Sequence, residues 1–165
     1  MNKKIILVFL ILSIFSTVFM IFAIGYKKDD EIIFVPPSFE KTVQLGKPSV
    51  EEQYGWTEIN QEGIGFITYL CGNLFVYDTN KTDIYLTNLE SNEVWIKLRV
   101  YNEDNEIIAE TGLIKPGEYV KSIQFNKKVI ENEKVKMKIM AYEPNTYYSE
   151  GSIVLNTYIS SLEVD

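Results

Sequence analysis

The chain has 165 residues, of which 46% are hydrophobic and 13% aromatic, and its formal net charge is −7. This length suits one domain and an anchor, and it is too short for two full domains. The chain has no histidine and one cysteine, which excludes imidazole metal sites, histidine-based triads and an intrachain disulfide. The acidic charge argues against nucleic acid as a partner, because a phosphate-binding protein needs a basic face and none is evident in the sequence.

The first element is an uncharged apolar run from Ile5 to Ile24. Twenty helical residues at about 1.5 Å each span about 30 Å, the thickness of the hydrocarbon core of a bilayer. We therefore predict that this run contacts the membrane as a single-pass helix. Lys3 and Lys4 before it balance Lys27 and Lys28 after it, so lysine counts give no orientation. The terminal amine and the short N-terminal flank favour a chain in the cell membrane whose C-terminal domain is extracellular.

The rival interpretation of this segment is a cleaved signal peptide. Ala23 and Gly25 have the spacing of small residues at a cleavage site, but the apolar run is longer than the 7–15 residues typical of a signal peptide. We predict that residues 1–25 are a membrane anchor, either a signal anchor or an uncleaved signal peptide. Whether the segment is cleaved stays open at this point.

Residues 26–62 have the composition of a stalk or arm, with three of the five prolines. Glu31–Val35 could form a short strand that ends at the following prolines. Ser49 and Glu52 fit a capping box, and Gly55 fits the residue that ends a helix, so a short helix is predicted near 50–54. Tyr54, Trp56 and Ile59 are too apolar for a free linker, so we predict that this part of the arm docks on the following domain.

Residues 63–165 predict an all-β domain. Short apolar stretches separated by turn signals predict about seven strands, at 66–77 (broken at 72–73), 83–87, 94–101, 107–108, 119–125, 135–142 and 152–159. The clearest is Val94–Tyr101, in which aliphatic residues alternate with Trp95, Lys97, Arg99 and Tyr101. Turns every 8–12 residues favour an antiparallel immunoglobulin-like β-sandwich, although the Cys–Trp–Cys signature is absent. The alternative is a small antiparallel barrel.

A resemblance supports this fold class. The segments that carry it are Thr87-Asn88, Ser91–Trp95, Glu110–Val120 and Ala141–Pro144, within about 40% of the chain. The chain resembles uncharacterised small membrane-anchored Gram-positive (Firmicutes) proteins with an immunoglobulin-like ectodomain. The resemblance implies an association with the cell envelope or with mobile genetic elements, and it implies no catalytic residue.

A possible binding face combines strand and loop residues. Tryptophan, tyrosine and arginine are the residue types that most often anchor interfaces. The candidates are Trp95, Arg99, Tyr101, Tyr142, Tyr147 and Tyr148, and Lys97 and Met140 share the outward positions of the same strands. The alternative is that these side chains pair across strands, or pack on the end of the domain, and only stabilise it.

No residue pattern indicates a catalytic, cofactor or metal site. Cys71 lies in an apolar stretch, so we predict that its thiol is buried and inert. The acidic residues at 103–106, at the tip of a predicted hairpin, lack the spacing of a calcium loop. We predict a non-enzymatic module that binds an envelope protein without metal, cofactor or nucleic acid. One alternative is a binder of cell-wall polysaccharide or peptidoglycan through exposed aromatic rings, and a less favoured one is an enzyme with paired carboxylates.

Overall fold

The computed structural model describes residues 2–25, 34–77 and 80–160. The chain divides into two compact units, Met1–Val35 and Pro36–Asp165. Most of the strand predicted at Glu31–Val35 lies outside the described residues. The second unit begins well before residue 63, so residues 36–62 of the predicted arm belong to the β unit.

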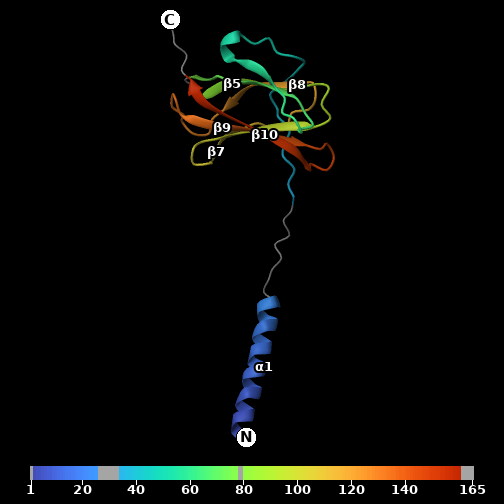
Figure 1. Cartoon of the computed structure of the whole chain (residues 1–165), viewed down its shortest axis with the longest axis vertical. Helices are drawn as coiled ribbons and strands as arrows, with labels where there is room; N and C mark the ends of the chain where they lie inside the picture. The colour runs from blue at the N-terminus through green and yellow to red at the C-terminus, as the bar shows by residue number, and fades with distance from the viewer. Residues whose placement is uncertain (1, 26–33, 78–79, 161–165) are drawn as a thin grey trace. The chain divides into compact units, whose positions relative to one another are not determined.

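The first unit contains one helix, α1 (Lys3–Gly25) (Figure 1). Its stretch from Lys3 to Phe22 is long and apolar enough to cross a bilayer. The hydroxyl of Thr17 donates a hydrogen bond to the carbonyl of Ser13 at 2.9 Å, which satisfies this polar group within the helix. Ser13, Ser16 and Thr17 are the polar residues of the run from Ile5 to Ile24, and the run contains no charge, so nearly the whole helix surface is apolar and suited to lipid.

The second unit is built almost entirely from strands. Its elements are β1 (Val43–Leu45), η1 (Glu52–Tyr54), β2 (Trp56–Ile59), β3 (Thr68–Cys71), β4 (Leu74–Tyr77), β5 (Lys81–Asn88), β6 (Trp95–Tyr101), β7 (Ile107–Glu110), β8 (Glu118–Gln124), β9 (Lys134–Tyr142) and β10 (Ser149–Ser160). Every stretch predicted as a strand within residues 63–165 contains one, and the break at 72–73 separates β3 from β4. The all-β prediction for this unit is confirmed.

The strands form one sheet that curls over on itself. Its order is β1-β8-β5-β4-β10-β9-β6-β7, with β3 beside β5 and β2 beside β3. The β5–β8 and β6–β9 pairs lie in two facing layers (Figure 1). Most neighbours are antiparallel, but β4 and β10 pair in parallel through Leu74–Ile159 and Phe75–Ser160, and this pair joins the layers at one side.

The predicted seven-stranded, fully antiparallel sandwich therefore needs correction. The described residues contain ten strands in a curled, mixed half-barrel. Two of the additional strands, β1 and β2, come from the predicted arm, whose sequence lacks the clear alternation of a strand. The parallel β4–β10 pair joins segments more than eighty residues apart, and local sequence patterns carry no information about such a pairing.

The core lies between the two layers. Ile96, Leu98 and Val100 of β6 are fully buried, which confirms the alternation predicted for this strand. They belong to the same apolar cluster as Ile84 and Leu86 of β5 in the facing layer. Because no disulfide is available to Cys71, burial of these aliphatic side chains is the main source of stability.

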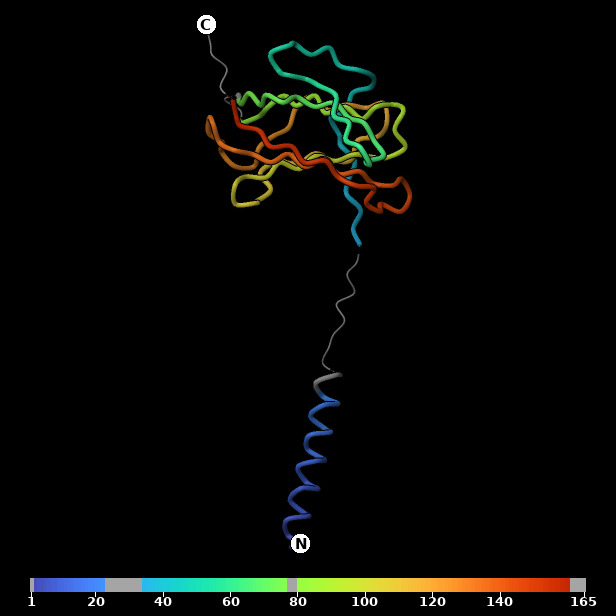
Figure 2. The backbone as a smooth tube through the Cα atoms, viewed as in Figure 1, coloured from blue at the N-terminus to red at the C-terminus, as the bar shows by residue number. Residues whose placement is uncertain are grey.

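The arm joins the layers at a second side of the unit. Phe39 forms a parallel bridge with Leu113, and Leu113 is followed by Ile114, which bridges Ile96 of β6. A few residues later, β1 pairs with β8 in the other layer. Figure 2 shows this segment in blue beside both layers. The arm is therefore a structural strap of the β unit.

A carboxylate holds this strap in place. Glu40 accepts hydrogen bonds from the backbone N–H groups of Gly112 at 2.8 Å, Lys41 at 2.9 Å and Thr42 at 3.0 Å, and from the Thr42 hydroxyl at 2.8 Å. Burial raises the pKa of Glu40, but these hydrogen bonds lower it by more, so this pKa lies below its usual value. The ionised carboxylate thus stabilises the crossing point of the arm and the segment after β7.

The predicted short helix exists but starts later than expected. The 3₁₀ turn η1 follows Glu51, and no side chain caps it, so the prediction of Ser49 as the capping residue is wrong. Tyr54 is buried with its ring 5.6 Å from Phe75, and strand β2 begins directly afterwards, which limits the turn to three residues. Gly55 ends the turn with φ of 59°, as predicted.

Candidate binding face

The outward side chains of β6, β9 and β10 form one continuous surface, which we call the outer face. The strand register places them in rows: Trp95, Tyr142 and Ser149; Lys97, Met140 and Ser152; Arg99, Lys138 and Val154; Tyr101, Lys136 and Asn156; Lys134 and Tyr158. Four of the six predicted binding residues, Trp95, Arg99, Tyr101 and Tyr142, lie on this face. The other two lie in the loop between β9 and β10.

The predicted residues do not form one cluster. Trp95 and Tyr101 are six residues apart on β6, which is about 20 Å along a strand. The Trp95 ring is 4.7 Å from Phe39 of the arm and 5.4 Å from Tyr147, both in edge-to-face arrangements. Trp95 is therefore half-buried by neighbours within its own unit, which fits a structural role better than a free platform. Tyr148 is 74% exposed.

The middle of the outer face is a charge network. The Lys97 amine and the Arg99 Nε atom each lie 3.0 Å from the same Oε2 atom of Glu110 on β7. Burial raises the pKa of Glu110, but the hydrogen bonds from Lys97 and Arg99 lower it by more. Since Lys97 is only 7% exposed, Glu110 balances a charge that water reaches poorly. This network stabilises the strand pairs and leaves little of Lys97 for a ligand.

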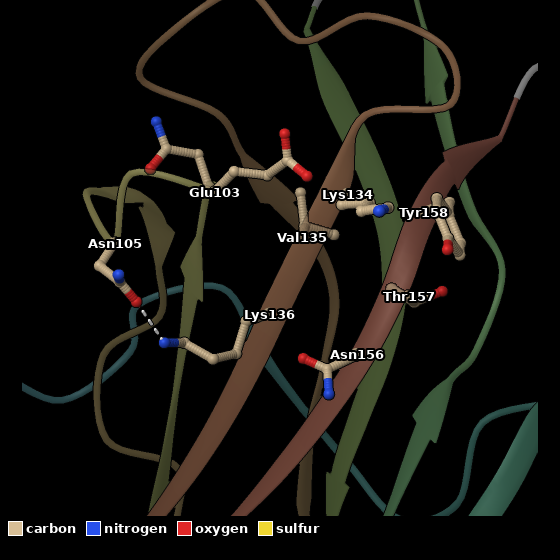
Figure 3. Close-up of a pocket in the computed structure, with 9 residues that line it drawn as sticks. Glu103, Asn105, Lys134, Val135, Lys136, Asn156, Thr157 and Tyr158 are labelled. Atoms are coloured by element: carbon tan, nitrogen blue, oxygen red, sulfur yellow. Dashed lines mark hydrogen bonds between the residues drawn. The ribbon is translucent and has the colours of Figure 1, made fainter.

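The far end of the face is an open groove of about 340 Å³ that the sequence did not predict. It is lined by Asn102, Glu103, Asn105, Lys134, Val135, Lys136, Asn156, Thr157 and Tyr158. Figure 3 shows Lys136 reaching from β9 toward the hairpin, where its amine donates to Asn105 Oδ1 at 2.6 Å. The same amine lies 5.0 Å from the Tyr101 ring centroid. The missed signal was the lysine at alternate positions 134, 136 and 138 in the first half of β9.

One edge of β10 is open. Ser149–Tyr158 pairs with β9 on one side, whereas β4 reaches only Ile159 and Ser160 on the other side. The Thr157 hydroxyl donates to the Gly72 carbonyl at 2.8 Å, and among the described residues no strand pairs with Ser152–Asn156 on that side. Strand β10 has neither lysine nor proline, two residues that often prevent association at exposed edges.

A second aromatic cluster lies on the other layer, at the β2–β3 hairpin. The Trp56 and Tyr69 rings stack at 4.5 Å, and the Lys47 amine lies 5.3 Å and 5.1 Å from their centroids. The Tyr69 hydroxyl donates to Glu58 at 2.6 Å, and this hydrogen bond raises the pKa of Tyr69. The Trp56 indole N–H donates to the Tyr85 carbonyl at 3.0 Å. These contacts account for the docking of this part of the arm.

The surroundings of Cys71 and the distribution of acidic side chains bear on catalysis and metal binding. Cys71 is fully buried, and burial, with a smaller effect of Asp83, raises its pKa to about 12, so its thiol is neutral at physiological pH. Among the described residues, no group of three or more Cys, Asp or Glu side chains is placed to hold a metal ion. The predicted absence of enzyme activity, metal and cofactor stays a prediction.

Comparisons with known proteins add no family assignment. No protein-family model, curated protein or solved structure in these comparisons matches the chain. The resemblance to membrane-anchored Gram-positive proteins therefore stays a prediction.

Proposed function

We propose that this chain is a non-catalytic, membrane-anchored module whose β unit is extracellular and binds another protein of the cell envelope. Binding adds a strand of the partner to the open edge of β10. The open edge between Ser152 and Asn156 is the observation that carries this proposal. An unpaired strand edge presents backbone donors and acceptors that an extended peptide satisfies by β-augmentation.

Side chains next to the open edge favour an extended partner segment with alternating apolar residues. On β10, Ile153 is buried and Leu155 is half-buried against the core, so the inner side of this edge is apolar. Ile64 lies beside the strand, since a Cβ on Gly151 would be 3.9 Å from its Cγ2 atom. An added strand would cover Leu155 and Ile64 with its inward side chains, and backbone hydrogen bonds would supply the remaining affinity.

The N-terminal helix supplies the membrane anchor in this proposal. Helix α1 has the length and apolarity to span a bilayer once. We place the N-terminus in the cytoplasm and the β unit outside, in the envelope of a Gram-positive cell. An anchor keeps the module at a high local concentration near membrane-bound partners, so an interface of modest affinity suffices.

Photocrosslinking in cells tests the open edge. A photoreactive residue at Ser152, on the open part of β10 and outside the groove, is expected to give one discrete protein adduct. The same residue at the exposed Lys128 is expected to give none. Leu155→Lys places a charge under the added strand and is expected to reduce the adduct at least tenfold. The matched control Val154→Lys places the same charge on the outer face and is expected to retain it. Absence of an adduct at Ser152, or equal loss in both lysine variants, would contradict the proposal.

Exposed tyrosines support a second candidate, a wall-polysaccharide binder. Tyr148 is 74% exposed and Tyr158 is 53% exposed, and such rings serve as stacking platforms for sugars. Trp95 is less suited to this role, since Phe39 and Tyr147 contact its ring. In the crosslinking experiment this candidate predicts adducts of heterogeneous mass that a muramidase digests, instead of one discrete protein band.

A further inference from the structure

We infer that the lysines of β9 bind a phosphodiester polymer whose repeating unit is hydroxylated, such as a polyol or a sugar. The site is the β9 lysine row, which consists of Lys134, Lys136 and Lys138, together with the groove at its end. This ligand contacts the outer face, so the inference does not depend on a protein partner at the β10 edge.

The row concentrates positive charge in an acidic protein. The chain has 16 lysines and arginines against 23 acidic residues. Strands β6 and β9 contain no acidic residue, and they carry five outward basic residues: Lys97, Arg99, Lys134, Lys136 and Lys138. Glu110 balances the first two of these. Glu103 lines the same groove, but within the described part of the chain no carboxylate lies within ion-pair distance of the β9 lysines, so their three charges exceed the one acidic group beside them and are available to an anion.

The spacing of the lysines in the row matches the spacing of the phosphates in an extended polyanion. Alternate residues of a strand are about 6.8 Å apart along it, and all three side chains point to the same side. Successive phosphates of an extended phosphodiester chain with short polyol units are separated by a similar length. Lysine also suits this ligand, since its ammonium group acts as a point charge for phosphate and needs no bidentate geometry.

The groove favours a hydroxylated repeat. Asn156 provides an amide donor and acceptor beside the row, and Tyr158 provides an exposed ring and a hydroxyl. The Asn102 amide is hydrogen-bonded to Glu106, and Asn105 Oδ1 accepts from Lys136, so these two asparagines mainly shape the groove. The Asn156 amide and the Tyr158 hydroxyl form hydrogen bonds with hydroxyls located between two phosphates. Figure 3 shows Lys134, Lys136, Asn156 and Tyr158 on neighbouring strands around this groove.

An acidic peptide and a nucleic acid fit this surface less well. The ladder hydrogen bonds of a sheet run between its strands, so a peptide on the outer face would find no partners there for its own N–H and C=O groups. A phosphodiester chain has no backbone N–H to satisfy. Single-stranded nucleic acid gains affinity from several stacked bases, but Lys136 covers Tyr101, which leaves Tyr158 as the exposed ring among those at the groove.

The test uses the full chain in phosphatidylcholine nanodiscs and short oligo(glycerol phosphate) as the probe. The logarithm of affinity should fall with the logarithm of salt concentration with a slope of about −2, as three phosphate contacts require. This slope corresponds to about sixteenfold weaker binding when salt rises from about 50 to about 200 mM. Lys134→Gln/Lys136→Gln/Lys138→Gln should bind at least about tenfold more weakly, with a slope near zero.

The matched control removes the same number of positive charges from another part of the surface. Lys41→Gln/Lys81→Gln/Lys128→Gln replaces three lysines that lie off the outer face, and it should keep the affinity and the slope. Poly-glutamate and single-stranded DNA of equal charge should bind more weakly than the probe. The inference is overturned if oligo(glycerol phosphate) does not bind at low salt, if both triple variants lose affinity equally, or if either competitor binds as tightly.

Discussion

Replacing Asn88 with alanine is expected to lower the free energy of unfolding of the β unit by about 3 kcal/mol, because it leaves several buried polar groups without a partner. Asn88 is fully buried at the end of β5. Its amide donates to the carbonyls of Val94 at 2.9 Å and Ile114 at 3.0 Å, and its Oδ1 atom accepts from the Asn92 amide at 2.6 Å. Asn88 therefore connects β5, the start of β6 and the segment that pairs with the arm.

The second asparagine extends this network to the start of β3. Asn92 donates to the Ile67 carbonyl at 2.6 Å and accepts from the Ile67 N–H at 3.0 Å. Without Asn88, the Asn92 amide and two backbone carbonyls lose hydrogen bonds in a place that water reaches poorly. Asparagine side chains often bond only their own backbone in turns, whereas Asn88 and Asn92 also connect strands that are distant in sequence.

Denaturant titration of the full chain in detergent measures this effect. Both tryptophans, Trp56 and Trp95, lie in the β unit, so their fluorescence reports on its unfolding and not on the anchor. The control Asn156→Ala removes an exposed amide and should change stability by less than about 0.5 kcal/mol. Equal stability of the Asn88→Ala variant and the wild type would show that the network contributes nothing.

Gly112→Ala is expected to detach the arm from the segment after β7 and to destabilise the β unit by about 2–3 kcal/mol. A Cβ at this position would lie 2.4 Å from the backbone nitrogen of Glu40 and 2.6 Å from its Cα atom. Both are backbone atoms of the strap, so no side-chain rotation relieves the clash. The hydrogen bond between the Gly112 N–H and the Glu40 carboxylate, 2.8 Å long, would also be disturbed.

Limited proteolysis separates loss of the strap from global unfolding. The variant should be cleaved between residues 36 and 45 at protease concentrations that leave the wild type intact, while its fluorescence still reports a folded core. Gly65→Ala is the matched control, since no atom lies within 4 Å of a Cβ at that position. Wild-type stability and protection of the Gly112→Ala variant would disprove the tight crossing of the two segments.

The local elements of this fold could be predicted from its sequence, and their assembly could not. Alternation in Val94–Tyr101 and the break at 72–73 each reflect contacts between near neighbours in the chain, and the structure confirms both. The strands of the arm are short, and their partners lie far away in sequence. Pairing of β1 with β8 and of β4 with β10 depends on how the two layers close, which no local pattern encodes.

In the candidate site, too, the local pattern could be predicted and the contacts between distant segments could not. Strand alternation placed Trp95, Arg99, Tyr101 and Tyr142 on one face, as the structure does. It did not predict that Phe39, from the arm, would contact Trp95, nor that Glu110 would balance Lys97. The open β10 edge was beyond prediction, because an edge is defined by which strands fail to pair.

Labelling in intact cells tests the central claim, an extracellular β unit held by an uncleaved anchor. Lys128→Cys introduces an exposed thiol, whereas the native Cys71 is fully buried and has a pKa of about 12, so it gives little background. We expect a membrane-impermeant maleimide to label the Lys128→Cys chain in intact cells, with the labelled, full-length chain in the membrane fraction. Labelling only after permeabilisation, or a shortened chain free of the membrane, would contradict the account.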